Sequence, residues 1–418
     1  MDTEHESLFL GSVRYLRGFL IWVSIGACLG LVGGVVGAAF CHSIEAVTEF
    51  RMEHPRIIWA LPLGGLVISY LYTRPRLKAA DTNRVRLAIP APPTIPTLTA
   101  PIIFVSAVIS HLLGASVGRE GAALQMGGVL GNKLAKLLRF NEKDTHLVIM
   151  CGMSAVFAAL FGCPLTAAIF AMEVASVGII HFSGEVPCLT ASLTATYLAK
   201  ALGAPPEHFP IIYIPPFTME RVGAVVLIAA IGAVVSILFC VSLHKGEHLY
   251  EHLFPNRHLR VLVGGAVIAV AVWAFGTTEY CGAGIPSIKA AVEGQADLHD
   301  FLMKIFFTVL AVSAGYKGGE IVPAMFIGST LGCVLGNWLG LPPGLGAAVG
   351  LLSMFCGSLN CPISTLLLGA ELFGSAGLRY YAIACAVSYM LSANYGLFKE
   401  QKIVYSKISP EFINRYTH

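Results

Sequence analysis

The stretch GASVGREGAALQMGG, residues 114–128, places an arginine and a glutamate among glycines in a chain that is otherwise rich in apolar residues. An ionisable pair is expensive to bury in lipid, so its presence within apolar sequence indicates a functional site. The composition of the rest of the chain shows whether a membrane is the right setting for this interpretation.

The composition is that of a polytopic membrane protein. Of 418 residues, 56% are hydrophobic and 12% are charged, whereas a soluble domain carries about 25% charged residues. Four apolar runs, at residues 19–40, 57–72, 222–243 and 261–275, approach the length that a helix needs to cross roughly 30 Å of hydrocarbon. We expect an all-α membrane protein without a soluble domain.

Loop charge, the N-terminal segment and cysteine spacing add three expectations about orientation, processing and disulfide or metal sites. Basic residues crowd the connection at 74–86, which the positive-inside bias predicts to be cytoplasmic. Residues 1–17 precede the first apolar run without a small-residue cleavage site, which predicts an uncleaved first helix. The eleven cysteines are spaced singly, as is typical of packing residues rather than of disulfide or metal sites.

Several apolar segments are interrupted by glycine or proline. These are residues 102–117, 122–138, 321–339 and 363–373. Irregular backbone at membrane depth is tolerated only where protein buries it or where it lines a watery cavity. The interruptions therefore favour a transport site inside the protein.

The chain also contains an internal duplication. GREGAALQMGGVLGN from Gly118 matches GGEIVPAMFIGSTLGC from Gly318 at an offset of 200 residues, which aligns Glu120 with Glu320. VFAALFGCPLTAAIFAMEV, residues 156–174, matches MFCGSLNCPISTLLLGAEL, residues 354–372, at an offset of 198. We predict two related halves, 1–205 and 206–418, joined near residues 203–216. Inverted repeats of this kind direct broken helices at one midplane site.

The second match also aligns two acidic residues, Glu173 and Glu371. We expect both to be structural carboxylates that hydrogen-bond nearby helix starts, although Glu173 could also relay protons through water.

Helix starts provide the predicted chemistry. A helix beginning at Gly121 or Ala122 has unpaired first amides that favour an anion, and so has a helix beginning near Ile321. The preceding glycines, such as Gly118, let the backbone approach a ligand closely. Binding by dipoles avoids a full positive charge, which would hold the anion too tightly for rapid exit.

Glu120 lies at the first of these helix starts, where its carboxylate would compete with the anion for the same amides. Ionised, it would close the path; protonated, it would swing away and open it. We therefore predict that Glu120 is a gate and a proton carrier. The alternative is that Glu120 only caps its helix or pairs with Arg119.

These motifs together resemble the CLC family of anion channels and proton-coupled anion antiporters. The resemblance rests on GREGAALQMGG, FGCPLTAAIFAMEV, GGEIVPAMFIG and IVYSKI, and extends from about residue 20 to about residue 410. It implies a fold of two inverted repeats with short, tilted and broken helices, a homodimer with one anion pathway per subunit, and cytoplasmic termini in the inner (plasma) membrane. It also implies that Glu120 is the external gate, that the Tyr405 hydroxyl contacts the central anion, and that Ile321 and Val322 supply amides.

Three departures from the family pattern bear on the substrate. AADTNRVRLAI, residues 79–89, stands where the family has Gly-Ser-Gly-Ile-Pro, so Thr82 and Asn83 are expected to begin the helix lining the inner anion site. Val174 follows Glu173 where chloride antiporters carry a second glutamate, so that proton station is missing. Glu320 in GGEIVP resembles the fluoride/proton antiporter branch, although Val322 replaces the threonine expected there.

We therefore predict a proton-coupled halide antiporter with fluoride favoured over chloride, since Asn83 and a protonated Glu320 could donate hydrogen bonds to a small anion that has shed its water. A passive chloride channel of the same family is the alternative, favoured by Val174. A receptor or structural protein disagrees with the duplicated broken helices. We expect no enzymatic activity, cofactor, metal or nucleic-acid partner, because His111 and His181 belong to no ligand pattern and no P-loop is present. The expected anion-binding residues are Thr82, Asn83, Gly118, Gly121, Ala122, Glu320, Ile321, Val322 and Tyr405.

Overall fold

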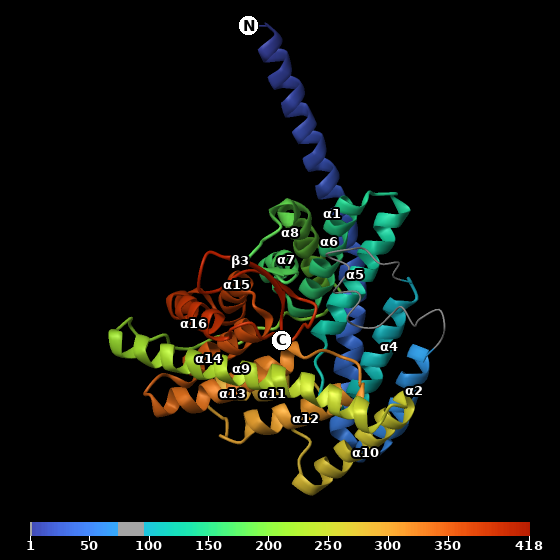
Figure 1. Cartoon of the computed structure of the whole chain (residues 1–418), viewed down its shortest axis with the longest axis vertical. Helices are drawn as coiled ribbons and strands as arrows, with labels where there is room; N and C mark the ends of the chain where they lie inside the picture. The colour runs from blue at the N-terminus through green and yellow to red at the C-terminus, as the bar shows by residue number, and fades with distance from the viewer. Residues whose placement is uncertain (1, 74–95) are drawn as a thin grey trace.

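The structure is a computed structural model that describes residues 2–73 and 96–418, with side chains from residue 13 onward. The basic connection at 74–86, with Thr82 and Asn83, lies outside the described residues. The described part is mainly helical, which confirms the predicted fold class (Figure 1).

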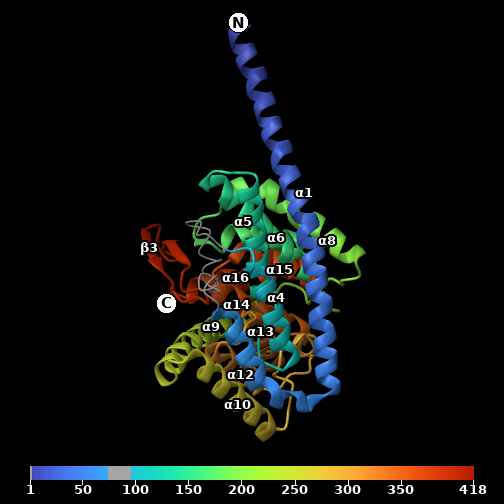
Figure 2. The same cartoon turned by 90° about the vertical axis from the view of Figure 1, so that its right-hand side faces the viewer.

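The first part of the chain begins with one very long helix. It projects far beyond the body of the molecule and then runs alongside it, next to α8 (Figures 1 and 2). The helices of this part are α1 (Asp2–Glu53), α2 (Leu61–Thr73), α4 (Thr99–Leu112), α5 (Glu120–Leu137), α6 (Glu142–Phe161), α7 (Pro164–Glu173) and α8 (Glu185–Ala201).

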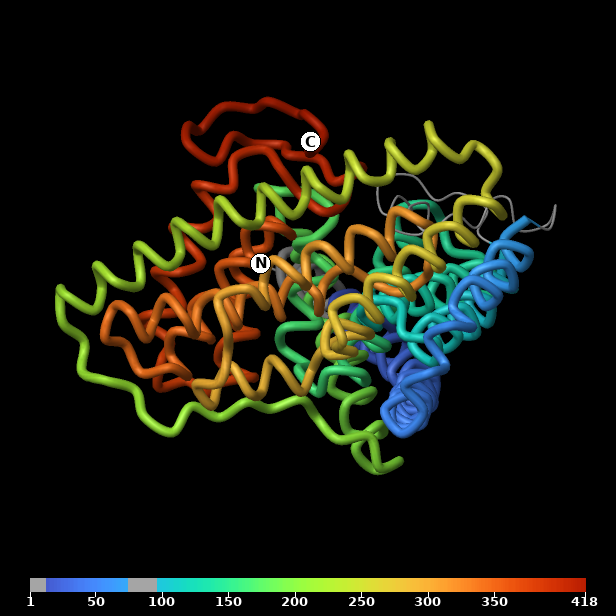
Figure 3. The backbone as a smooth tube through the Cα atoms, turned by 90° about the horizontal axis from the view of Figure 1, so that it is seen from below, coloured from blue at the N-terminus to red at the C-terminus, as the bar shows by residue number. Residues whose placement is uncertain are grey.

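The second part also begins with a long helix, which crosses one edge of the molecule when seen from below (Figure 3). Its helices are α9 (Met219–Leu253), α10 (Arg257–Phe275), α11 (Ile285–Val292), α12 (Asp300–Ala314), α13 (Ile321–Trp338), α14 (Pro343–Leu359), α15 (Pro362–Phe373) and α16 (Leu378–Leu391). The five helices from α4 to α8 and the five helices from α12 to α16 have similar lengths when they are compared pair by pair in chain order. This order supports two related halves, and their boundary between residues 205 and 206 stays a prediction.

Six helices among the described residues are long and apolar enough to cross a membrane. In α1, α2 and α10 only 33% of the apolar window is buried, whereas in α6 and α13 the buried share is 83%. The first group therefore offers apolar side chains to lipid, and the second group forms the interior. This distribution places α13, whose start is one of the predicted anion-binding helix starts, inside the protein.

Glycines let the interior helices pack with almost no side chains between them. A Cβ atom on Gly332 of α13 would collide with the backbone carbonyl of Gly346 on α14, and a Cβ on Gly131 of α5 would collide with that of Val148 on α6. Small residues at such contacts are the usual means by which membrane helices approach closely. The same device thus operates at α5–α6 and at α13–α14.

A small sheet completes the fold and was not predicted from the sequence. Strand β1 (Ser176–Val177) pairs in parallel with β2 (Lys402–Tyr405), which pairs antiparallel with β3 (Phe412–Tyr416). Its C-terminal strands lie at the outer side of the helices (Figures 2 and 3). The sheet joins the chain that follows α7 to the C-terminal segment that carries Tyr405.

Most of the cysteines are buried in helices. All eleven are free thiols, and ten of them are buried in the described structure, with Cys28 exposed. Eight of them lie in helices, as predicted, whereas Cys163 and Cys361 are the N-cap residues of α7 and α15 and Cys281 lies between α10 and α11.

Candidate functional site

The two duplicated glycine motifs meet at a backbone bridge between Gly118 and Gly319, called the glycine crossing below. The Gly118 amide donates to the Gly319 carbonyl at 2.6 Å, and the Gly319 amide donates to the Gly118 carbonyl at 2.8 Å. A Cβ on Gly118 would lie 2.8 Å from Oε2 of Glu120 and 3.0 Å from Cδ of Pro323. A Cβ on Gly319 would lie 2.6 Å from the backbone nitrogen of Gly121, so glycine is required at Gly319, and the bridge holds the starts of α5 and α13 side by side.

Helix α5 begins one residue earlier than predicted. The sequence suggested a start at Gly121 or Ala122, but the Arg119 carbonyl accepts the Ala123 amide at 3.1 Å, so Glu120 already belongs to the first turn. Arg119 is the N-cap residue, and its own side chain makes no capping hydrogen bond. Gly121 and Ala122 follow in the first turn and are buried.

Helix α13 begins at Ile321, as predicted. The Glu320 carbonyl accepts the Ala324 amide at 3.0 Å, and Ile321 and Val322 are fully buried. Pro323 has no N–H, so the amides of Ile321 and Val322 are the donors that this start can offer to an anion. Both helix starts therefore bring backbone N–H groups into the interior near the glycine crossing.

The Glu120 side chain is fully buried and folds back over its own helix start. Its Oε2 accepts the Arg119 amide at 2.9 Å, and its Oε1 lies 3.5 Å from Nε of Arg119. The carboxylate thus lies where the amides and the helix dipole favour negative charge. This is the geometry that both the gate and the capping interpretation of Glu120 require.

Arg119 connects Glu120 to a second carboxylate that the sequence analysis missed. Its Nη2 forms an ion pair with Oε1 of Glu207, and its Nη1 lies 3.6 Å from Sγ of Cys41. Glu207 belongs to the connection between α8 and α9, within the predicted joint at 203–216. The available signal was a carboxylate flanked by prolines, in GAPPEHFP.

A cavity of about 370 Å³ opens beside this arginine. Its polar wall consists of Glu45, Thr48, Glu49, Arg51, His111, Arg119, Glu207, Thr278, Glu279 and Ser287. The start of α11, at Gly284 and Ile285, forms another part of the wall. The cavity thus reaches Arg119, one residue from Glu120.

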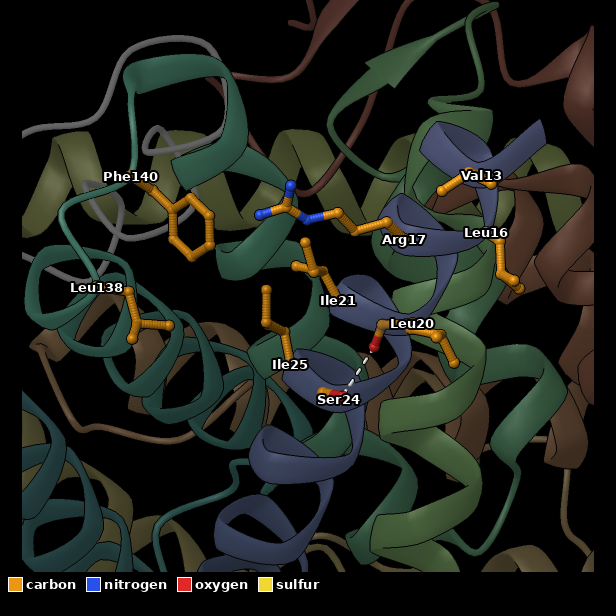
Figure 4. A pocket seen from close by; sticks show the side chains of 9 residues that line it. All are labelled: Val13, Leu16, Arg17, Leu20, Ile21, Ser24, Ile25, Leu138 and Phe140. Carbon is orange, nitrogen blue, oxygen red and sulfur yellow. Dashed lines mark hydrogen bonds between the residues drawn. The ribbon is translucent and has the colours of Figure 1, made fainter. Parts of the chain in front are cut away.

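A second hollow, of about 620 Å³, lies on the flank of α1 (Figure 4). Arg17, Ile21 and Ile25 of α1 point toward Leu138 and Phe140 beyond the end of α5, and Arg17 is the one charged residue in this lining. Because its lining is largely apolar, this hollow is not the candidate ion site.

The residues predicted to form the gate and the anion site divide into three groups. The glycine crossing brings Gly118, Glu120, Gly121 and Ala122 together with Glu320, Ile321 and Val322. Tyr405 lies on β2, 45% exposed, with its ring 5.9 Å from that of Phe412. Thr82 and Asn83 lie outside the described residues.

Glu173 and Glu371 bind helix starts, which confirms that prediction. The Glu173 carboxylate accepts the amides of Ile363 and Ser364 at 3.1 and 2.9 Å, at the start of α15. The Glu371 carboxylate accepts those of Leu165 and Thr166 at 3.0 and 2.8 Å, at the start of α7.

These features together define a membrane transport protein. Apolar helices can span a bilayer, two helix starts meet inside the protein, and a buried carboxylate lies over one of those starts.

The chain belongs to the voltage-gated chloride channel (CLC) family. The family model described as voltage gated chloride channel matches residues 64–393. A chloride/fluoride channel protein of Pseudomonas syringae pv. tomato is 36% identical over 394 residues, which are 92% of this chain and 87% of that protein. An H(+)/Cl(-) exchange transporter, ClcA, of Vibrio cholerae is 25% identical, over 82% of this chain and 80% of that protein.

Solved structures agree with this assignment. The crystal structure of a CLC-type fluoride/proton antiporter matches with a TM-score of 0.88 at 30% identity, over 91% of this chain and 98% of that one. A slow cyanobacterial Cl-/H+ antiporter shares the fold, with a TM-score of 0.75 at 17% identity over 89% of this chain and 94% of that one. As a family member, the chain is an anion transport protein of the membrane rather than an enzyme.

Proposed function

We propose that this protein is a proton-coupled halide antiporter that favours fluoride over chloride. The observation that carries the proposal is the buried carboxylate of Glu120, folded over the start of α5 and held beside the start of α13 by the Gly118–Gly319 bridge. The names of the relatives, which include a chloride/fluoride channel protein and a fluoride/proton antiporter, support the same ions.

Glu120 acts as both gate and proton carrier in this proposal. The ionised carboxylate occupies the amide-lined position and excludes the anion, because both compete for the same donors. Protonation removes the charge that the helix start attracts, so the side chain leaves and an anion takes its place. The ionised carboxylate and the anion therefore exclude each other at one position, so protonation of Glu120 and anion binding are linked.

The proposed anion ligands come from both halves. The amides of the two helix starts provide dipolar binding, and Glu320, when protonated, provides a donor to a strongly hydrated anion. The full proposed set is Thr82, Asn83, Gly118, Gly121, Ala122, Glu320, Ile321, Val322 and Tyr405. Val322 has no hydroxyl, so backbone N–H groups carry more of the binding at this helix start.

Glu173 does not serve as the inner proton station in this proposal. Both of its carboxylate oxygens accept backbone amides at the start of α15, and Val174 follows it in the chain. The proton therefore reaches Glu120 by a route that does not use the position of Glu173.

We place the protein in the inner (plasma) membrane as a homodimer, with cytoplasmic termini and two inverted halves, 1–205 and 206–418. The exposed apolar faces of α1, α9 and α10 support contact with lipid or with a second subunit. Light scattering of the purified protein in detergent tests the dimer.

Proteoliposomes loaded in turn with fluoride and chloride test the transport proposal. We expect fluoride efflux accompanied by proton uptake, and loss of the proton uptake in Glu120→Gln. Chloride efflux without any pH change would instead establish the passive chloride channel.

A further inference from the structure

We propose that Glu207 is a positioning residue that holds Arg119 away from the gate and thereby sets the pH at which Glu120 opens. The inference rests on the proposed role of Glu120 as the gate. It concerns a residue of the connection between the two halves, outside every motif that identifies the family.

Arg119 lies between two carboxylates and binds them unequally. Its terminal Nη2 forms a close ion pair with Glu207, whereas its Nε lies 3.5 Å from Oε1 of Glu120. The tip of the guanidinium therefore points to Glu207, and Glu120 meets the stem side of the same group. Because charge-assisted N–H···O bonds are short, the close Nη2 contact makes Glu207 the stronger partner of Arg119, and the 3.5 Å contact at Nε makes Glu120 the weaker one.

Burial makes this division of one positive charge important. The Arg119 and Glu120 side chains are 5% and 1% exposed, and Glu207 is 19% exposed. Charges buried in protein interact more strongly than charges in water, since little solvent screens them. Glu207, on the cavity wall, neutralises part of the field that Arg119 would otherwise direct at the gate.

The other titratable groups near this trio leave the assignment intact. From the elements packed around it, the groups nearest Arg119 or Glu207 include Cys41 and Glu45 of α1, His111 of α4, and Cys163 at the start of α7. Three further charged groups, Glu49, Arg51 and Glu279, line the same cavity. The Cys41 thiol donates to Glu45 at 3.2 Å and its sulfur lies 3.6 Å from Nη1 of Arg119, so the thiol lies between that carboxylate and the guanidinium. Among the described residues, the acidic groups within ion-pair distance of Arg119 are Glu120 and Glu207.

The backbone around Glu207 is anchored well enough to fix a side chain. The Glu207 amide donates to the Phe161 carbonyl, at the end of α6, at 2.9 Å. Two residues later, the Phe209 amide donates to the Leu372 carbonyl of α15 at 2.8 Å. The connection is thus tied to helices of both halves, and its carboxylate has a defined place.

The two members of the ion pair are expected to have opposite effects on the gate. In Glu207→Gln the guanidinium keeps its charge and turns to the Glu120 carboxylate, which favours the ionised, closed gate. Half-maximal transport then requires a lower pH, by roughly 0.5–1 unit. In Arg119→Gln the carboxylate loses its positive neighbour, so half-maximal transport moves to a higher pH.

The test is the pH profile of fluoride efflux from proteoliposomes for both variants and for the double variant. Since Glu207 acts through Arg119, the double variant should match Arg119→Gln alone, whereas independent effects would add. Glu251→Gln is the control: this carboxylate pairs with Arg260 at 3.0 Å and does not line the cavity, so the profile should stay that of wild type.

An unchanged or upward-shifted profile in Glu207→Gln, or an additive double variant, would overturn the inference. If Glu207→Gln does not fold, Glu207→Asp supplies the test, because the shorter side chain lengthens the ion pair and should shift the profile downward by a smaller amount. Wild-type efflux without any pH dependence would instead reject the gate itself, which separates failure of the proposed function from failure of this inference.

Discussion

Glu173 and Glu371 each lie at the end of one helix and cap the start of the other: Glu173, the last residue of α7, binds the first amides of α15, and Glu371, near the end of α15, binds those of α7. The two helices are thereby joined at both ends. Each carboxylate meets the positive end of a helix dipole, where negative charge is favoured. The duplicated glutamates thus bind α7 and α15, which carry the two related sequence motifs, to each other.

Replacing either glutamate should destabilise the protein. Glu173→Gln leaves one acceptor oxygen for two amides, and the loss of a charge-assisted hydrogen bond costs about 1–3 kcal/mol. We expect a lower melting temperature in detergent. Glu251→Gln, at a carboxylate that is 55% exposed and pairs with Arg260, is the control and should change stability by less than about 1 kcal/mol. Equal melting temperatures for the two variants would refute the capping role.

The glycine crossing predicts a sharp steric limit. In Gly118→Ala the new Cβ would lie 2.8 Å from the Glu120 carboxylate, so the side chain must leave its place over the helix start. Proton coupling should fail, with a loss of stability of about 1–3 kcal/mol from overpacking. Fluoride efflux recorded together with pH measures the coupling.

Gly223→Ala provides the control for the crossing, because nothing lies within 4 Å of a Cβ at this position in α9. It should keep full coupling and gain up to about 1 kcal/mol of helix stability. Full coupling in Gly118→Ala as well would mean that the carboxylate does not need this position.

Lys304 is a fully buried lysine whose removal should be costly. Its Nζ donates to the carbonyls of Tyr280 and Gly282 at 3.1 and 2.7 Å and lies 5.1 Å from the centre of the Phe326 ring. Lys304→Met leaves two buried acceptors without this donor, at a cost of about 1–3 kcal/mol each. Thermal unfolding should show the loss, whereas Lys289→Met, on the exposed face of α11, should stay within about 0.5 kcal/mol of wild type.

Gln401 ties the C-terminal sheet to the helices. Its Nε2 donates to the carbonyls of Val174 and Leu359 at 2.9 and 2.8 Å, just before the strand that carries Tyr405. Gln401→Leu should loosen this segment, so we expect faster proteolysis after residue 400 and slower fluoride efflux. Arg415→Ala, at an exposed position of β3, is the control. Proteolysis that is equally slow in both variants would show that the sheet is held by other contacts.

The sequence was most informative where one physical pattern dominated. Apolar runs predicted the membrane helices, and the repeated glycines before Glu120 and Ile321 predicted the two helix starts that meet, because only glycine fits where two backbones touch. The start of α5 was displaced by one residue, since a helix boundary depends on which carbonyl accepts the first hydrogen bond. Glu207 and the strand pairing of Tyr405 were missed because both depend on contacts between segments far apart in the chain, which no local pattern records.

The glycine contacts between α5 and α6 and between α13 and α14 make the interior rigid. Backbones in direct contact can neither slide nor rotate without collision, and a close-packed interior transmits strain rather than yielding to it. Work done on a bound anion must then be performed by groups of a few atoms, such as one carboxylate. A turnover cycle would leave the outline of the molecule, and the lipid that surrounds it, undisturbed.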